Sequence, residues 1–317
     1  MTENKYIYEV YKERSFSSAA KNLYVSQPAL SASIKKAEDR LGFSIFDRST
    51  SPISVTQEGL IYIESIEKIN RINEETLTKL SDIGKLKYGH LSICGENFVS
   101  SFIMPKIILE YSKRYPGIEI ELIESNSPDL RLQILNESVD LLIAHDFNGN
   151  LFDFEPLFSE TLLLAVPINF KINEGLKEYQ LSVQDVIAGR HLEENFPKIS
   201  LSRFKKEPFI LLKKGNDTYR RAKQLFEEEG FTPKNVVINL DQLITSYNMA
   251  CAGLGVIFVS DMVVKSSKEQ GVVFYKLSGH SVYRTMQIGY KKNRYVSRAM
   301  SEFIKIAKEV YKENLKK

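Results

Sequence analysis

The segment SFSSAAKNLYVSQPALSASIKKAEDRLG, residues 15–42, constrains the fold more than any other part of the chain. It contains two helical patterns on either side of a break at residues 24–26. Ser26 is a good N-cap, and Pro28 falls in the first helical turn, where its missing N–H costs nothing. Gly42 stands where a helix commonly ends with a left-handed residue. The segment therefore predicts a short helix, a tight turn, and a second helix that stops before Gly42.

The second helix has two different faces. One carries apolar side chains at steps of four and three, namely Leu30, Ile34, Ala37 and Leu41. The other carries Gln27, Ser31 and Lys35, with Pro28 and Ala32 beside them. Short side chains let a partner approach the backbone closely, and Gln and Ser can hydrogen-bond base edges in a major groove. The pattern alone is equally compatible with a DNA recognition helix and with a plain helical hairpin.

Residues 57 to about 87 form one long helical pattern without proline. Its apolar positions recur at steps of three or five, at Leu60, Ile63, Ile66, Ile69, Ile72, Leu77, Leu80 and Ile83. Such a stripe on an otherwise charged helix has no local core to cover. We therefore expect it to pack on the same helix of a second copy, which predicts a dimer.

From His90 onward, apolar β-branched runs of strand length alternate with helical segments. The runs lie at 90–94, 118–124 and 139–144, and a second set lies at 161–167, 208–212, 236–240 and 255–260. Helical patterns cover about 101–115 and 128–136. This alternation is typical of a mostly parallel sheet with crossover helices. Two further runs and a helix from about Val296 are compatible with a return to the first sheet.

Length and composition limit the class of protein. A chain of 317 residues is too long for one compact core and predicts two or three domains. Its net charge of +3 neither demands nor excludes a nucleic-acid partner. The N-terminus lacks the pattern of a secretory signal, and the most apolar run, 250–264, is shorter than a membrane span. We expect a cytoplasmic protein without a membrane partner.

The chain carries no pattern of an enzyme or a metal site. It contains no nucleophile elbow, phosphate loop, zinc pair or Rossmann glycine fingerprint. Cys94 and Cys251 match no metal or redox spacing and are expected to be buried thiols. The histidines, at positions 90, 145, 191 and 280, are too scattered to form a metal set. We therefore expect no catalytic residues, no metal and no cofactor.

The stretch from Ser15 to Ser49 resembles the DNA-binding signature of LysR-type transcriptional regulators. The matching positions are Phe16, Ala19, Ala20, Leu23, Val25 through Ser31, Ile34, Glu38, Leu41, Gly42, Phe46 and Arg48. Residues 48–56 resemble the wing of that family, and residues 56–59 resemble the start of its linker helix. Residues 104–122 and 252–260 resemble two segments of its effector domain. The resemblance thus covers almost the whole chain.

The resemblance implies an architecture and its boundaries. The expected fold is an N-terminal all-α winged helix-turn-helix at 1–58, a long linker and dimerisation helix at 59–88, and an α/β effector-binding domain at 89–317. That domain resembles periplasmic binding proteins and has two subdomains, I at about 89–161 and 267–317 and II at about 162–266. The family also implies a homotetramer beyond the dimer, double-stranded DNA and a small-molecule effector as partners, and RNA polymerase as a further one.

The expected DNA contacts lie on the second helix and the wing. They are Ser26, Gln27, Pro28, Ser31, Ala32, Lys35 and Arg48, of which Lys35 and Arg48 are expected to hold phosphates. Two positions depart from the family, because Ala32 replaces a frequent arginine and the wing tip is neutral. Residues 1–58 contain 8 Lys and Arg against 7 Asp and Glu. We therefore expect a shallow dependence of DNA affinity on salt.

The expected effector contacts follow strand ends, where helix N-termini offer free N–H groups. They are Asn97, Ser100, Ser101, Asn126, Ser127, Asn216 and Thr218, and they suit a carboxylate or a similar small polar ligand. Each of them is equally well explained as an ordinary N-cap. Phe98 stands where the family often has a hydroxyl residue, and the connection 168–207 is longer than is usual.

Two hypotheses from different classes remain after the enzyme is set aside. The first is a sequence-specific transcriptional regulator whose activity depends on an effector bound between the subdomains. The second is a cytosolic small-molecule binding protein that has lost specific DNA binding and uses its N-terminal helices only for assembly. DNA binding that changes with the effector distinguishes them.

Overall fold

The computed structural model describes residues 2–50, 52–82, 88–124, 129–267 and 270–312. The chain divides into two compact units, residues 1–80 and 81–317. None of the described helices is long and apolar enough to cross a membrane.

The first unit is a helical domain with a small wing. Its helices are α1 (Thr2–Glu13), α2 (Phe16–Asn22), α3 (Gln27–Leu41) and α4 (Gln57–Asp82). The wing consists of β1 (Phe46–Asp47) and β2 (Ser54–Val55), which pair antiparallel and add the only strands of this unit among its described residues. The Ser26 side chain accepts a hydrogen bond from the Ala29 N–H, and Gly42 ends α3 with a φ of 79°. The expected cap and stop of the second helix are confirmed.

The long helix α4 serves two purposes along its length. Ile63 and Ile66 are buried in the core of the first unit, together with residues of α1 and α3. The expectation that the stripe has no local core is therefore wrong for Ile63 and Ile66. Beyond them, Ile69, Ile72 and Leu77 are exposed by 47, 63 and 66%. This second part of the stripe is the part available to a partner.

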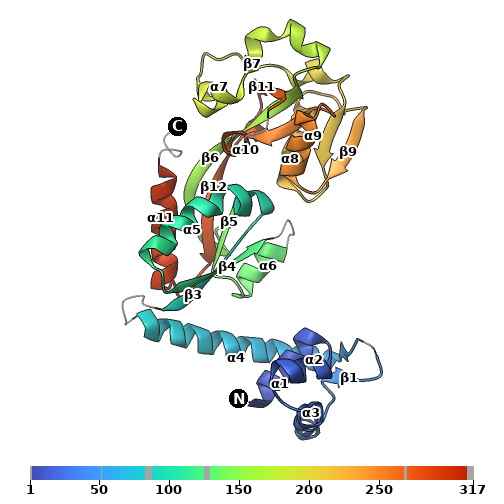
Figure 1. The fold of residues 1–317 in the computed structure, drawn as a ribbon, viewed down its shortest axis with the longest axis vertical. Helices are drawn as coiled ribbons and strands as arrows, with labels where there is room; N and C mark the ends of the chain where they lie inside the picture. The colour runs from blue at the N-terminus through green and yellow to red at the C-terminus, as the bar shows by residue number, and fades with distance from the viewer. Residues whose placement is uncertain (1, 51, 83–87, 125–128, 268–269, 313–317) are drawn as a thin grey trace. The chain divides into compact units, whose positions relative to one another are not determined.

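The second unit is built on a curled mixed sheet (Figure 1). Its strands are β3 (Gly89–Gly95), β4 (Ile118–Glu124), β5 (Leu141–Ala144), β6 (Phe152–Pro167), β7 (Gln180–Leu181), β8 (Phe209–Leu212), β9 (Val236–Leu240), β10 (Ile257–Ser260), β11 (Val272–Lys276) and β12 (Tyr283–Lys291). Its helices are α5 (Met104–Arg114), α6 (Asp129–Leu135), α7 (Val183–Ile187), α8 (Asp217–Glu228), α9 (Leu243–Cys251), α10 (Asp261–Ser266) and α11 (Arg298–Val310).

The sheet is parallel only in part, which corrects the expectation of a mostly parallel sheet. Strand β3 pairs parallel with β4 and β5, and β8 pairs parallel with β9 in a separate two-stranded sheet. The central strand β6 pairs antiparallel with β10, β11 and β12. The expected strand at 161–167 is only the second half of β6. The first half is not predicted as a strand, because polar residues interrupt its apolar pattern.

Strands β6 and β12 run between two subdomains (Figure 1). Subdomain I contains β3, β4, β5, the first half of β6, and helices α5, α6 and α11, and its core includes Tyr111 and Phe303. Subdomain II contains the second half of β6 and helices α7 to α10, with two apolar cores of its own. Strand β11 pairs with Leu163–Pro167 of β6. The structure therefore groups 272–276 with 162–266 rather than with the C-terminal segment, and the chain returns to subdomain I at β12.

Candidate functional sites

The polar face of α3 is open to solvent. Ser26, Gln27, Pro28, Ala32 and Lys35 are exposed and follow one another along the first two turns of the helix. The opposite face is fixed in the core through Leu30, Ile34 and Ala37, which are at most 1% exposed. The helix therefore presents short side chains outward on a rigid support, which is the geometry that groove recognition requires.

Arg48 is held by the domain itself. Its guanidinium donates to the Glu38 carboxylate at 2.9 Å and to the Ser31 hydroxyl at 3.2 Å, and it lies 5.0 Å from the centre of the Phe16 ring. Glu38 also accepts hydrogen bonds from the backbone N–H groups of Ile45 and Phe46 at 2.8 and 3.2 Å. This network joins α3 to the wing and fixes the position of Ser31.

Tyr24, in the turn between α2 and α3, was not among the expected contacts. Its side chain is 96% exposed, and its backbone φ is 55°. A left-handed backbone is unfavourable for a tyrosine by about 1 kcal/mol relative to glycine. The sequence gives no signal for it beyond an aromatic residue in a turn that glycine or asparagine would fill more easily.

A cleft lies between the subdomains of the second unit. It encloses about 460 Å³ and is lined by residues of both subdomains. Leu130, Leu142 and Ala144 of subdomain I contribute its apolar wall. Subdomain II contributes Gly215, Asn216, Asp217, Tyr219, Arg220 and Lys223, from the start of α8. A cleft with an apolar wall and a few convergent polar groups is typical of a small-molecule site.

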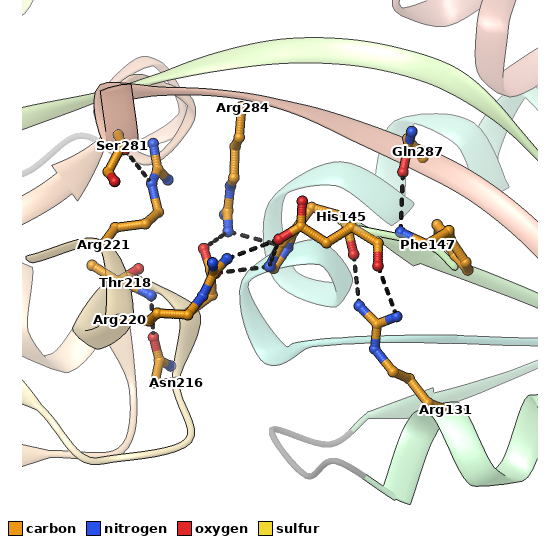
Figure 2. Close-up of polar contacts among 12 residues, drawn as sticks. Arg131, His145, Phe147, Asn216, Thr218, Arg220, Arg221, Ser281, Arg284 and Gln287 are labelled. Carbon is orange, nitrogen blue, oxygen red and sulfur yellow. Dashed lines mark hydrogen bonds and ion pairs between the residues drawn. The ribbon is translucent and has the colours of Figure 1, made fainter. Parts of the chain in front are cut away.

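Asp217 joins the two subdomains across this cleft. One oxygen of its carboxylate lies 2.8 Å from Nε2 of His145, at the end of β5, and the other is ion-paired with Arg284 of β12. Figure 2 labels these two partners, His145 and Arg284. Arg220, one turn further along α8, also pairs with Asp217 and reaches the exposed Asp146 at 2.9 Å. The Asp217 side chain is only 5% exposed.

A second carboxylate lies deeper in the same network. Glu160 of β6 is fully buried and pairs with Arg284 and with Arg221 of α8, the latter at 2.7 Å. Arg221 also donates to the backbone oxygens of Ser281 and Val282. Ser260 donates its hydroxyl to the other oxygen of Glu160 at 2.8 Å. The network thus fixes α8 against the strands that connect the subdomains.

Both carboxylates remain ionised in this dry environment. Burial acts to raise the pKa of Asp217, but the hydrogen bond from His145 and the charge of Arg284 hold that pKa well below its usual range. Burial acts in the same direction on Glu160, and the charges of Arg284 and Arg221 again hold its pKa below the usual value. A buried charge is tolerated when partners of this kind surround it.

Arg131 of α6 also lines the cleft, but its hydrogen-bond partners are backbone oxygens and not carboxylates. Its guanidinium donates to the backbone oxygens of His145 and Asp146 at 2.7 and 3.1 Å, and it lies 5.7 Å from the centre of the Phe147 ring (Figure 2). No carboxylate of the described residues forms an ion pair with it. Arg131 is therefore a fixed positive charge that lines the cleft without a neutralising acid.

The cleft also contains a group with the composition of a metal site. The ligand atoms of His145, Asp146 and Asp217 lie within 4.8 Å of one another. However, Arg284 and Arg220 are ion-paired with the same carboxylates. A divalent cation there would be placed beside two guanidinium groups, so the residues present fit an ion-pair network and do not fit a metal.

The expected effector residues lie in different environments. Asn216 lines the cleft, and Thr218 is buried beside it at the start of α8, where its N–H donates to Asn216 Oδ1 at 2.9 Å. Asn97, Ser100 and Ser101 do not line the cleft, although the neighbouring Glu96 does. Ser100 is buried and its hydroxyl finds no hydrogen-bond partner among the described residues. Asn126 and Ser127 lie outside the described residues.

The residues that build the cleft were mostly missed by the sequence analysis. His145, Glu160, Arg131, Asp217 and Arg284 are not among the expected effector contacts, although Asp217 lies between the expected residues Asn216 and Thr218. The one available signal is Glu160, a lone acid at the head of the apolar run TLLLAVP. The other residues come from distant segments and have no common spacing.

Comparison with known proteins agrees with this geometry. The model described as "Bacterial regulatory helix-turn-helix protein, lysR family" matches residues 2–60, and the model described as "LysR substrate binding domain" matches residues 85–312. The uncharacterised HTH-type transcriptional regulator YcgK of Bacillus subtilis is 29% identical over 311 residues, which cover 98% of this chain and 94% of YcgK.

Two solved structures share the fold. Full-length CbnR complexed with its target DNA has a TM-score of 0.67 at 16% identity and covers 98% of this chain and 99% of that one. The regulatory domain of CcmR from Synechocystis, in complex with 2-PG, has a TM-score of 0.57 at 17% identity and covers 71% of this chain and 98% of that one. At these identities the likeness shows the fold alone.

A winged helix-turn-helix together with a two-lobed α/β domain and its cleft defines a class of DNA-binding proteins with a ligand-binding domain. The chain belongs to the LysR family of transcriptional regulators. It binds DNA through the helix-turn-helix and a small-molecule effector through the substrate-binding domain, and the family consists of regulators rather than enzymes.

Proposed function

We propose that the exposed face of α3 reads the operator of this regulator. The contacts are Ser26, Gln27, Pro28, Ser31, Ala32 and Lys35, and we add Tyr24 from the turn before the helix. The proposal rests on the exposure of these side chains, of which only Ser31 is partly buried, on a helix whose other face is fixed in the core. Gln27 and Ser31 offer hydrogen bonds to base edges, while Lys35 meets a phosphate.

Arg48 takes a modified role in this proposal. Glu38 already neutralises its charge, and its exposed fraction is 39%. We propose that Arg48 positions Ser31 for the groove and meets a phosphate only with its remaining donors. The expected salt dependence is correspondingly shallow, because few uncompensated cations lie on this surface.

We propose that the effector is a small anion, such as a carboxylate, bound in the cleft. The single observation that carries this proposal is Arg131, a fixed guanidinium that lines the cleft without an acid to neutralise it. Lys223 and Asn216 lie on the opposite wall and complete a polar site for a ligand with one or two anionic groups. The 2-PG bound by the CcmR domain is a precedent in a protein of the same fold.

The proposal also covers the domain boundaries, the oligomeric state and the location of the protein in the cell. We propose domain boundaries at 1–58, 59–88 and 89–317, and a dimer in which the exposed part of the α4 stripe packs on a second copy. A tetramer, contact with RNA polymerase and a cytoplasmic location follow from the same role. The exposed apolar side chains Ile69, Ile72 and Leu77 support the dimer.

The first test is a pull-down of fragmented chromosomal DNA with the purified protein, followed by sequencing and footprinting of the enriched sites. We expect a few sites with an approximately two-fold symmetric core, because a dimer presents two copies of α3. The footprint is then repeated with small carboxylates and phosphorylated acids. An anion that changes the wild-type footprint, but not that of Arg131→Gln, supports the cleft. No enrichment at low salt contradicts the proposed operator contacts.

A further inference from the structure

The cleft already contains an anion that belongs to the protein. The carboxylate of Asp217, in subdomain II, is surrounded by His145 and Arg284 of the other wall and by Arg220 of its own helix. Figure 2 shows the side chains of His145, Arg220 and Arg284 converging on one point from separate elements. An arrangement of two guanidinium groups and an imidazole around one carboxylate is the arrangement expected around a bound acid.

The location of Asp217 strengthens this interpretation. It is the first residue of α8, a helix of twelve residues whose N-cap is Asn216. Free N–H groups and the helix dipole make such a position favourable for negative charge. The Asp217 side chain therefore occupies the place where an anionic ligand of this cleft would gain the most from the protein.

The two arginines that pair with Asp217 also have other acidic partners, which they would keep if Asp217 moved away. Arg284 keeps Glu160, and Arg220 keeps Asp146. The network without Asp217 would therefore stay intact but would lack one negative charge. That missing charge is what an anion from solution can supply.

We propose that Asp217 is an internal occupant of the effector position, and that an anionic effector binds by displacing its carboxylate from His145 and Arg284. This inference rests on the proposed anionic effector and adds the mechanism by which the cleft responds to it. Because Asp217 links α8 to the end of β5 and to β12, its release removes two contacts between subdomain II and subdomain I, while the Arg220–Asp146 pair remains. The effector thus shifts the equilibrium between two arrangements of the subdomains by replacing an internal ion pair.

The test uses the full-length protein and three variants. Asp217→Asn removes the internal anion with little change of shape, and Asp217→Ser is a second variant that is also compatible with a helix start. Asp146→Asn is the matched control, because it removes one carboxylate from the same region of the cleft. Asp146 is 66% exposed, and among the described residues its ion-pair partners are Arg220 and His145. Circular dichroism first verifies that each variant is folded.

Binding of inorganic phosphate and of malonate is then measured by calorimetry, at an ionic strength held constant with sodium chloride. We expect both Asp217 variants to bind these anions at least tenfold more tightly than the wild type, and Asp146→Asn to stay within about threefold of it, because solvent screens an exposed charge. A folded variant of either kind is sufficient for the comparison.

Two outcomes overturn different parts of the argument. If the anions bind the wild type and the Asp217 variants with equal affinity, or bind the variants more weakly, Asp217 is not an occupant of the effector position, although the anionic cleft stands. If neither anion binds any of the proteins, the proposed anionic effector fails, and the displacement mechanism fails with it.

Discussion

The DNA-facing surface of α3 and the cleft of the second unit are both polar, but they are built in opposite ways. On α3 the side chains are short, mostly exposed and supported from behind by an apolar core. In the cleft, Asp217, Arg221 and Glu160 are at most 6% exposed and are neutralised by partners within the protein.

The exposed α3 surface and the buried ion pairs of the cleft differ because DNA and a small ligand bind in different ways. DNA has a fixed shape and charge, so a surface that reads it can remain hydrated and ready. A small ligand is enclosed when it binds, so the groups that receive it must be stable in a dry environment even when it is absent. Internal ion pairs provide that stability, and they also give the cleft a defined structure.

The largest effect is expected from Glu160→Gln, which removes the deepest charge of the cleft network. Arg221 and Arg284 would then share a site without this carboxylate, and loss of one partner from a buried network costs about 3–5 kcal/mol. We expect a loss of unfolding free energy of about 3 kcal/mol, measured by urea titration with circular dichroism.

The control for that variant lies on the same strand. Glu155→Gln breaks an ion pair with Lys308 in which both side chains are more than 40% exposed, and it should cost less than about 1 kcal/mol. Equal costs for the two variants would remove the contrast between buried and exposed pairs.

The contribution of Glu160 to stability depends on pH. Burial acts to raise the pKa of Glu160, but its two arginines lower that pKa overall. The stabilisation by the Glu160 carboxylate is therefore complete above its ordinary pKa of 4.5 and disappears as the pH falls through the lower pKa of the folded protein.

The α3 surface is tested by Ser31→Glu, which places a negative charge on the face proposed to meet DNA. We expect specific DNA binding to fall at least a hundredfold, about 3 kcal/mol, because the new carboxylate faces phosphates and base edges. Gel-shift titration on the footprinted operator measures the change.

Ser33→Glu is the matched control on the same helix, because it adds the same charge about 200° around the helix axis from Ser31. It should retain most of the DNA affinity. A folded Ser31→Glu protein that binds its operator normally would show that another face of α3 enters the groove.

Arg131→Gln removes the arginine of the cleft that has no acidic partner among the described residues, in contrast to Arg220 and Arg284, which are ion-paired. We expect anions to bind about tenfold more weakly, because one charge-assisted hydrogen bond contributes about 1.5–3 kcal/mol. Arg114→Gln, which breaks an exposed pair with Glu309 in the same subdomain, is the control and should leave anion affinity unchanged. Similar losses in the two variants would indicate general electrostatics in place of a site.

The smallest effect is expected from Tyr24→Asn. Asparagine tolerates the left-handed backbone of this turn, so the unfolding free energy should stay constant or rise by up to about 1 kcal/mol. Operator affinity should nevertheless fall severalfold, because an exposed aromatic contact is lost. A variant that is more stable and binds DNA with full affinity would remove Tyr24 from the interface.

The sequence by itself determined the DNA-binding unit and most of the elements of the second unit. The N-cap Ser26, the stop at Gly42 and the apolar positions of α3 act over a few residues, so their spacing is visible in the chain. The expected strand at 118–124 matches β4 and that at 236–240 matches β9, because both segments are rich in isoleucine or valine over the length of a strand. The match to the LysR signature is likewise local and ordered.

Only the tertiary structure decided how the cleft is built. His145, Glu160, Asp217 and Arg284 come from four separate elements, and all but Glu160 have the sequence pattern of an ordinary surface charge. The antiparallel pairing of β6 and β12 places Arg284 opposite Glu160, more than 100 positions away in the chain. Asp217 then pairs with Arg284 and with His145. Ion pairs act through space and leave no periodicity in the chain, so the sequence could name the cleft and one residue of its lining, but not the internal carboxylate that occupies it.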